Sequence, residues 1–211
     1  MPGTFNGTTL TISATPVDHA LIPDEGATNV AGIAIVGSDM YCVKTTGLKT
    51  TLLKTTDYMA TKATAVKKDL NWFALGLTKI GNYLYMLAED HKGYGGSTTI
   101  VKLDTKGNQL GTYSINEICP KGALGITAAD GTNEKFIIMH YADKSNAGTL
   151  TFSVVDWKAA KAASTFTVTN SGFGYTTQLQ DIYYHTSFGL FILTNNTFST
   201  CLLYTSPSPR D

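Results

Sequence analysis

The sequence contains few charged residues and no excess of either sign. Asp, Glu, Lys and Arg together make 15% of the 211 residues, whereas about 25% is usual for soluble domains. The acidic and basic residues balance to a formal net charge of zero. Because binding to a polyanion depends on a basic surface that neutralises phosphates, we expect no nucleic-acid partner.

Long apolar runs are also missing. No stretch approaches the ~20 apolar residues that a membrane-spanning helix needs, and residues 1–15 lack the basic start and apolar centre of a signal peptide. We therefore expect no membrane insertion. The richness in Thr, Gly and Tyr at low charge favours a secreted or cell-surface protein, whose signal would lie outside this reading frame.

The three cysteines and four histidines do not form a recognisable metal or redox motif. Cys42 lies in an apolar run and Cys119 precedes Pro120, and neither has a partner at CxxC spacing. The histidines show no pairwise ligand spacing, and His140 ends an apolar run, which indicates a satisfied core residue. We expect buried thiols, no metal and no other cofactor.

What the sequence does contain is a repeat of an apolar run, a turn and a second apolar run. The four copies cover residues 30–43, 75–87, 124–139 and 179–193. The best match is AlaLeuGlyLeuThr at 74–78 against AlaLeuGlyIleThr at 123–127. If Gly32, Gly76, Gly125 and Asp181 are equivalent, the offsets are 44, 49 and 56 residues, near the roughly 40–50 residues of four-stranded repeat units.

The repeat predicts four antiparallel strands per unit. The second run is apolar on both sides, which a strand tolerates when both sheet faces are covered. We expect third strands at 50–55, 98–103 and 149–155, and fourth strands at about 61–67, 109–115 and 164–169. Residues 101–106 and 154–158 both end in Asp-x-Lys, where the Asp side chain can bond the backbone of the following turn.

Four-stranded units at this period resemble the β-propeller superfamily in its divergent bacterial forms, over residues 30–200. The resemblance implies an all-β fold of radially packed blades. A β-sandwich is the alternative, but it explains neither the recurrence of AlaLeuGly-x-Thr nor that of Asp-x-Lys. Residues 1–29 would then be an N-terminal strand, at 8–14, and a connector.

The last eleven residues, 201–211, break from the Thr-rich pattern and resemble one translated reading frame of the transposon-end adapter used in sequencing libraries. This resemblance implies a non-native tail and native sequence that stops at Thr200. We then expect an open arc of about three blades plus a partial fourth, with the tail making few contacts. The remaining blades would lie in a missing C-terminal part, and the strand at 8–14 would be left without the last blade it could complete.

In a propeller, the loop between the second and third strands and the connection between blades emerge on one face. Aromatic rings beside carboxylates on that face would suit a carbohydrate or a peptide. The candidate ligand-binding residues there are Trp72, Asp90, His91, Tyr94, Asp143, Lys144, Phe173 and Tyr175. The alternative role of Trp72, with Phe73, is to plug the gap between blades, and that of Asp90 and Asp143 is to hold their own loops.

These features favour a non-enzymatic recognition platform for a carbohydrate or protein ligand, within a larger surface or secreted protein. The alternative is an extracellular polysaccharide hydrolase or lyase that uses a carboxylate pair such as Asp90 and Asp143. Glycosidic cleavage needs an acid and a base roughly 5–10 Å apart, and the sequence shows no pair that meets this requirement. We therefore predict binding rather than catalysis and assign no catalytic residue.

The balanced charge predicts no measurable affinity for duplex DNA at physiological salt. The measurement is a fluorescence titration of labelled duplex with the protein at two salt concentrations. Submicromolar binding that weakens steeply with salt would contradict this prediction, because it would reveal a basic surface.

Overall fold

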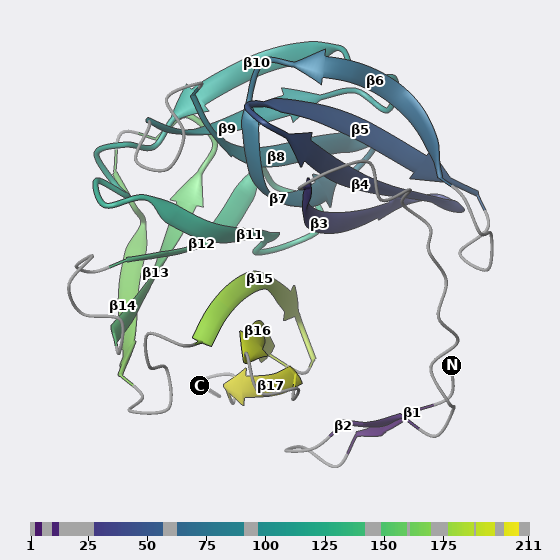
Figure 1. Cartoon of the computed structure of the whole chain (residues 1–211). Helices are drawn as coiled ribbons and strands as arrows, with labels where there is room; N and C mark the ends of the chain where they lie inside the picture. The colour runs from purple at the N-terminus through teal and green to yellow at the C-terminus, as the bar shows by residue number, and fades with distance from the viewer. Residues whose placement is uncertain are drawn as a thin grey trace.

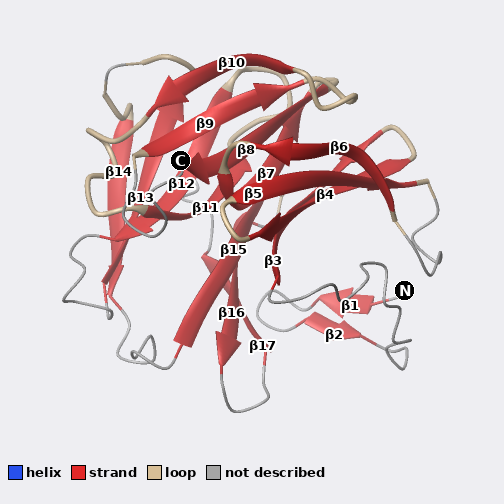
Figure 2. Cartoon of the chain, turned by 45° about the horizontal axis from the view of Figure 1, so that its top comes forward, coloured by secondary structure: helices blue, strands red, loops and turns tan. Residues whose placement is uncertain are grey.

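The computed structural model describes the chain as an all-β protein. The described residues are 3–5, 10–12, 28–56, 63–90, 97–141, 149–159, 161–169, 177–187, 189–196 and 201–206. Figure 2 shows strands and loops in this part of the chain and no helix. None of the described segments is therefore a helix that could cross a membrane.

The strands form three four-stranded sheets, one three-stranded sheet and one two-stranded sheet, and all pairings are antiparallel. The first sheet contains β3 (Thr28–Val36), β4 (Asp39–Thr46), β5 (Lys49–Thr55) and β6 (Thr64–Leu70). The second contains β7 (Phe73–Ile80), β8 (Tyr83–Glu89), β9 (Thr98–Leu103) and β10 (Gln109–Ser114). The third contains β11 (Ala123–Ala128), β12 (Lys135–Tyr141), β13 (Thr149–Asp156) and β14 (Ser164–Thr169). The fourth contains β15 (Thr177–His185), β16 (Gly189–Asn196) and β17 (Cys201–Ser206), and a separate hairpin contains β1 (Gly3–Phe5) and β2 (Leu10–Ile12).

The four larger sheets are the blades of a propeller arranged around a common axis (Figure 1). The first strand of each blade is innermost, and β3, β7, β11 and β15 pack side by side in that order. The innermost strands of the fourth and first blades meet at only a few residues. The predicted arc of three four-stranded blades plus a partial fourth is confirmed, and the two face-packed sheets of a β-sandwich are not observed.

Each innermost strand carries one β-bulge at the same place in the repeat. Directly after the bulge, Ile33, Gly76, Gly125 and Asp181 pair with the second strand of their own blade. The predicted equivalence is therefore confirmed for three positions and is off by one residue at Gly32, which is the bulged residue itself. A Cβ on Gly32 would lie 2.0 Å from the backbone nitrogen of Leu77, and its φ is +64°. Only glycine allows this close approach of β3 to β7.

The Thr of the AlaLeuGly-x-Thr motif links neighbouring blades. The hydroxyl of Thr78 accepts a hydrogen bond from the N–H of Ala128 in the next blade, at 3.1 Å. The hydroxyl of Thr127 accepts one from the N–H of Tyr184 in the blade after that, also at 3.1 Å. The recurrence of this motif therefore has a physical cause: each Thr satisfies a backbone donor of its neighbour's innermost strand.

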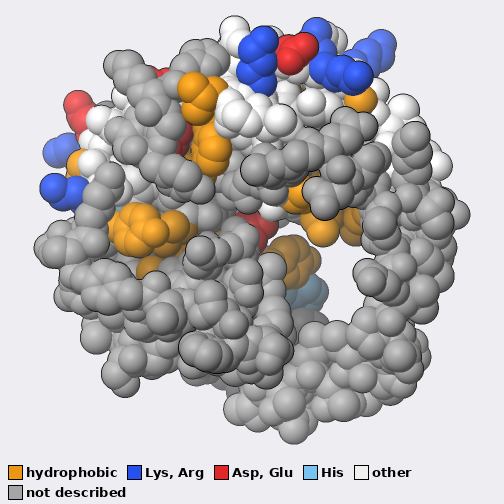
Figure 3. Space-filling model, in the orientation of Figure 1, with side chains coloured by type: hydrophobic (Ala, Val, Ile, Leu, Met, Phe, Trp, Pro, Cys, Tyr) orange, Lys and Arg blue, Asp and Glu red, His pale blue; other side chains and the backbone are white. Residues whose placement is uncertain are grey.

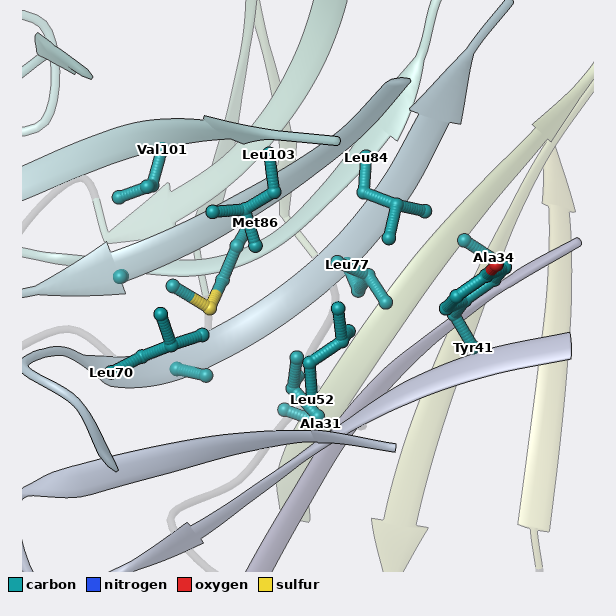
Figure 4. Packing of buried hydrophobic residues seen from close by; sticks show 13 residues of the cluster. Ala31, Ala34, Tyr41, Leu52, Leu70, Leu77, Leu84, Met86, Val101 and Leu103 are labelled. Atoms are coloured by element: carbon teal, nitrogen blue, oxygen red, sulfur yellow. The ribbon is translucent and has the colours of Figure 1, made fainter. Parts of the chain in front are cut away.

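Three apolar clusters lie between successive blades rather than within them. In the first, Leu52 of one blade packs toward Leu77, Leu84 and Met86 of the next (Figure 4). Alternate residues of β8 divide between two clusters, so that Met86 faces the first blade and Leu87 faces the third. Strand β12 divides in the same way between the second and third clusters. The second strands are apolar on both faces for this reason, as the sequence predicts.

The two Asp-x-Lys segments predict that the side chains of Asp104 and Asp156 bond the turns that follow them. The carboxylate of Asp104 accepts hydrogen bonds from the N–H groups of Lys106 and Asn108, at 2.9 and 2.8 Å, which confirms the predicted role of this Asp. At Asp156 the backbone carbonyl accepts the turn N–H from Ala159 instead. The Asp156 carboxylate lies 3.5 Å from the Lys135 ammonium, because Lys135 is directly opposite Asp156 in the sheet.

The two described cysteines are buried and unpaired, as predicted. Cys42 belongs to a small cluster in the first blade and Cys119 to the apolar cluster between the second and third blades. Burial raises the pKa of Cys42 to about 11 and that of Cys119 to about 12. Both groups are therefore neutral thiols at physiological pH.

The expectation for the C-terminal tail is wrong in one respect. Cys201–Ser206 is strand β17, which pairs with β16 from Cys201 opposite Asn195 to Ser206 opposite Leu190. An open strand edge offers unpaired N–H and C=O groups, and the CysLeuLeuTyrThrSer segment has residues suited to a pleated surface. The tail therefore makes specific contacts, while its adapter origin stays a prediction.

The predicted strand at the N-terminus is present, but it is shorter than expected and has a local partner. Leu10–Ile12 pairs with Gly3–Phe5 in the separate hairpin, not with the fourth blade. A partner a few residues away costs less chain entropy than one at the far end of the sequence.

The inter-blade hydrogen bond predicts the effect of replacing Thr127 by Val. The variant keeps the side-chain shape but leaves the N–H of Tyr184 without its acceptor, so we expect a loss of about 1–3 kcal/mol in the free energy of unfolding. The measurement is urea denaturation of both proteins. Thr112→Val, on the exposed face of β10, is the matched control and should change stability by less than about 0.5 kcal/mol. Equal effects of the two substitutions would contradict the proposed role of the hydroxyl.

Candidate functional site

The main cavity of the described structure lies on the axis where the innermost strands converge. Its volume is about 790 Å³, and residues of β3, β7, β11 and β15 line it. Ligand sites commonly enclose about 300–1,000 Å³. Figure 3 shows hydrophobic, acidic and histidine side chains near the middle of the molecule, beside an opening. The size and position of this cavity make it the candidate ligand site.

The walls of the cavity are mainly apolar, although they are open to solvent. Ile33, Ile35 and Tyr183 line the cavity, and they are 62%, 54% and 60% exposed. Large apolar side chains this exposed on innermost strands are unusual, because burial of each would stabilise the fold by roughly 1.5–3 kcal/mol. Such surface in a concave site is suited to contact with a ligand.

One carboxyl group, that of Asp181, lies among these apolar walls. Its Oδ1 accepts a hydrogen bond of 2.9 Å from the N–H of Ile182. A Cβ built on Gly125 would lie 3.3 Å from the same oxygen, and one on Gly76 would lie 3.6 Å from it. The two glycines therefore leave room for the carboxyl group between the blades. Burial raises the pKa of Asp181 to about 7, and the hydrogen bond from Ile182 opposes this rise in part.

Among the described residues, the remaining charged or titratable groups on the cavity wall, apart from tyrosines, are Lys79, Asp130 and His185. The carboxylate of Asp130 accepts hydrogen bonds from the N–H groups of Thr132 and Asn133, at 2.9 and 2.6 Å, and from the Asn133 side chain. These bonds lower the pKa of Asp130 to about 2. The Nδ1 of His185 accepts a hydrogen bond of 3.1 Å from the N–H of Ser187. Both Asp130 and His185 thus also order the turns in which they lie.

Only two of the eight candidate residues predicted from sequence fall in the part of the chain that the structure describes. Trp72 and Asp90 are described, and neither lines the cavity wall. The other six candidates, His91, Tyr94, Asp143, Lys144, Phe173 and Tyr175, lie outside the described residues. The assignment of a binding face to their loops therefore stays a prediction.

The contacts of Trp72 agree with the alternative role given to it. Its ring packs against the cluster between the first and second blades, and its Nε1–H donates to Oε1 of Gln109 at 3.1 Å. Its neighbour Phe73 is buried. The backbone N–H of Asp90 donates to the carbonyl of Ser97, at the base of the loop between β8 and β9.

A second polar cluster lies in the third blade and contains His140. Its Nε2 is 2.9 Å from the hydroxyl of Ser153, which is 3.1 Å from the hydroxyl of Thr165. Burial lowers the pKa of His140, so the imidazole is neutral at physiological pH. The prediction of a satisfied core residue is confirmed. In the part of the chain that the structure describes, no three His, Cys, Asp or Glu side chains gather as metal ligands.

The sequence contained a signal for the cavity, but its meaning was not apparent from sequence alone. Asp181 takes the position that Gly76 and Gly125 occupy in two other repeats, so the fourth repeat has a carboxyl group where those repeats have no side chain. Tyr183 and Ile33 gave no such signal, since apolar residues on a strand usually indicate core. Their exposure follows from the convergence of four strands on an axis.

Comparison with known proteins supports the fold. No protein-family model and no curated protein matches the sequence. Among solved structures, the chain is similar to glutaminyl cyclase of Myxococcus xanthus, with a TM-score of 0.53 and 12% identity over 81% of this chain and 70% of the cyclase. It is also similar to an exo-β-1,3-galactanase of Phanerochaete chrysosporium, with a TM-score of 0.56 and 13% identity over 85% of this chain and 47% of the galactanase.

These likenesses show the fold and nothing finer. Both neighbours have propeller folds, in agreement with the four-stranded sheets observed here. The chain spans less than half the length of the galactanase. At this level of identity the fold does not determine activity, which depends on the residues of the site.

The position of Asp181 predicts how stability depends on pH. The folded pKa of about 7 lies above the unfolded value of about 3.9, so the stabilising effect of the neutral form is complete below about pH 4 and is lost as pH rises through 7. Asp181→Asn keeps the acceptor for the Ile182 N–H but cannot ionise. The variant should therefore become more stable relative to the unmodified protein as pH rises. The difference between their free energies of unfolding should change by up to about 4 kcal/mol between pH 4 and pH 8.

The measurement is urea denaturation of both proteins across this pH range. Asp156→Asn, which changes an exposed carboxylate far from the cavity, is the control and should give a nearly flat difference. A flat difference for Asp181→Asn as well would show that this carboxyl group is as well solvated as an ordinary surface carboxylate.

Proposed function

We propose that this protein is a non-enzymatic recognition protein that binds a carbohydrate in the central cavity. The observation that carries the proposal is the exposed ring of Tyr183 on the wall of the cavity that the exposed side chain of Ile33 also lines. Flat rings and apolar walls suit the apolar face of a pyranose, while a few polar groups fix its orientation. The cavity volume of about 790 Å³ is large enough for more than one sugar unit.

Polar groups for hydroxyl recognition are present on the same wall. Asp181 offers a carboxyl group, and Lys79 and His185 contribute further polar atoms among the lining residues. The galactanase that has a similar fold was solved with β-1,3-galactotriose. This trisaccharide is a suitable first probe, although the similarity extends only to the fold.

The arrangement of the carboxyl groups favours binding over catalysis. Asp130 is the other acidic residue of the cavity wall, and its two oxygens already accept hydrogen bonds from Thr132 and Asn133. A general base needs a lone pair directed at water or substrate. The loop contacts of Asp130 occupy its oxygens instead.

A polysaccharide hydrolase or lyase is the second candidate function. One observation favours it: two carboxyl groups of a single cavity have pKa values of about 7 and about 2, and such a separation is typical of acid and base pairs. In this case Asp181 would act as the acid and Asp130 as the base. Release of reducing ends from polysaccharides, lost in Asp181→Asn, would establish the enzyme and overturn the binding proposal.

The binding proposal predicts that Tyr183→Ala weakens carbohydrate binding by about 10-fold or more, because stacking contributes on the order of 1–3 kcal/mol per ring. The measurement is a glycan array followed by isothermal titration calorimetry with the best ligand. Tyr83→Ala is the matched control, since Tyr83 is also exposed but lies outside the cavity. If Tyr183→Ala binds as tightly as the unmodified chain, the ligand does not sit in this cavity.

A further inference from the structure

Asp181 is placed on β15 at a position that the repeat otherwise leaves without a side chain. In the second and third blades, the first residue after the bulge is Gly76 or Gly125. In the fourth blade it is Asp181. The carboxyl group enters the space that both glycines leave open. A residue that departs from the pattern of the other repeats, and that lowers the stability of the fold, is a candidate for a functional role.

The carboxyl group is only partly satisfied by the protein. Its Oδ1 accepts the N–H of Ile182. Within the described ranges, no Lys, Arg or His nitrogen lies within 4.0 Å of its oxygens, as it does at the four ion pairs found elsewhere. A carboxylate held in apolar surroundings needs a cation or several donors to be stable. Among these residues no donor to Oδ2 is found, and Asp181 is one of the residues that line the cavity.

The surroundings of Asp181 contain few groups that could supply such a cation. Strand β3 contributes no charged residue to the cavity wall. Lys79 from β7, Asp130 after β11, and Tyr183, Tyr184 and His185 from β15 are the charged or titratable residues on the wall. None of them forms an ion pair with Asp181. The space around its Oδ1 is bordered by Gly76 and Gly125, and Leu77 and Ile126 add apolar side chains to the same cavity wall.

We propose that the ligand of this cavity carries an amino group, which binds as an ammonium ion to the carboxylate of Asp181 while its carbon skeleton contacts the apolar walls. For the carbohydrate of the proposed function, on which this inference rests, the ligand is an amino sugar with a free amine. An N-acetylated sugar lacks the positive charge and is excluded as the preferred ligand.

The titration of Asp181 supports this assignment. A carboxyl group with a pKa of about 7 is neutral in an appreciable fraction of molecules at neutral pH, and an ammonium ion beside it favours the ionised form. Affinity for cyclohexylamine, which stays protonated throughout this range, should therefore rise between pH 5.5 and pH 8. Binding below pH 7 should release a proton, which appears as a dependence of the calorimetric enthalpy on the buffer.

The experiment is calorimetric titration of the full chain at pH 6.5, where the glucosamine amine is largely protonated, with trisaccharides of glucosamine, N-acetylglucosamine and glucose, and with cyclohexylamine. We expect the glucosamine trisaccharide to bind about 10- to 100-fold more tightly than the other two sugars, as is usual for a hydrogen bond to a charged group. Asp181→Asn should remove this preference and the rise with pH. Asp156→Asn, which lies outside the cavity wall and keeps the Asp181 carboxylate, should retain both.

The outcomes separate this inference from the proposed function. Equal affinity for all three sugars, unchanged in Asp181→Asn, would overturn the amine and leave carbohydrate binding intact. If no sugar binds but cyclohexylamine does, and Asp181→Asn abolishes its binding, the amine site is supported and the carbohydrate is wrong. If neither the sugars nor the amine bind, both proposals fail.

Discussion

The structure depends on the burial of both faces of the second strand in each inner blade. Met86 and Leu87 are neighbours in sequence, but they belong to apolar clusters on opposite sides of their sheet. A sheet with two apolar faces is stable only when another sheet covers each of them. The blades must therefore stand face to face, and because β-sheets are twisted, this packing arranges them around an axis. The close approach of innermost strands at Gly32 and the inter-blade bonds of Thr78 and Thr127 are consequences of this packing.

The cavity lies on the axis, beyond the region in which the blades pack face to face. Four innermost strands turn one side of their residues toward the axis, where none of the other described strands extends their sheets across the cavity. Ile33, Ile35 and Tyr183 are exposed there for that reason. Asp181 adds a carboxyl group whose ionisation is unfavourable in such surroundings. This combination of uncovered apolar surface and one acid that ionises with difficulty is costly for folding and is suited to a binding site.

The sequence predicts the local features well because they depend on nearby residues. Strands Thr98–Leu103 and Ser164–Thr169 lie where the alternation and turns indicate, and the carboxylate of Asp104 bonds its own turn. The alignment of Gly32 is wrong by one residue because Gly32 is the bulged residue of its strand, whereas Gly76 and Gly125 directly follow the bulges of theirs. The cavity could not be predicted because its walls come from four strands far apart in sequence. The pairing of Cys201–Ser206 was missed because the unpaired edge of β16 accepts a β-prone segment irrespective of its origin.

The hydroxyl bridges between blades also bear on how the molecule opens. Thr78 and Thr127 join the second, third and fourth blades in series, whereas Ile35 occupies the corresponding place in the first blade and offers no acceptor. There the paired hydroxyls of Thr45 and Thr50 hold the chain between the first and second blades instead, through Ala74 and Trp72. Each blade is thus tied mainly to its sequence neighbours, as in a linear array. The second and third blades are held on both sides and should exchange their amide hydrogens slowly. The fourth can detach by breaking its interface with the third blade and its few contacts with the first, which would give a ligand entry to the axis without global unfolding.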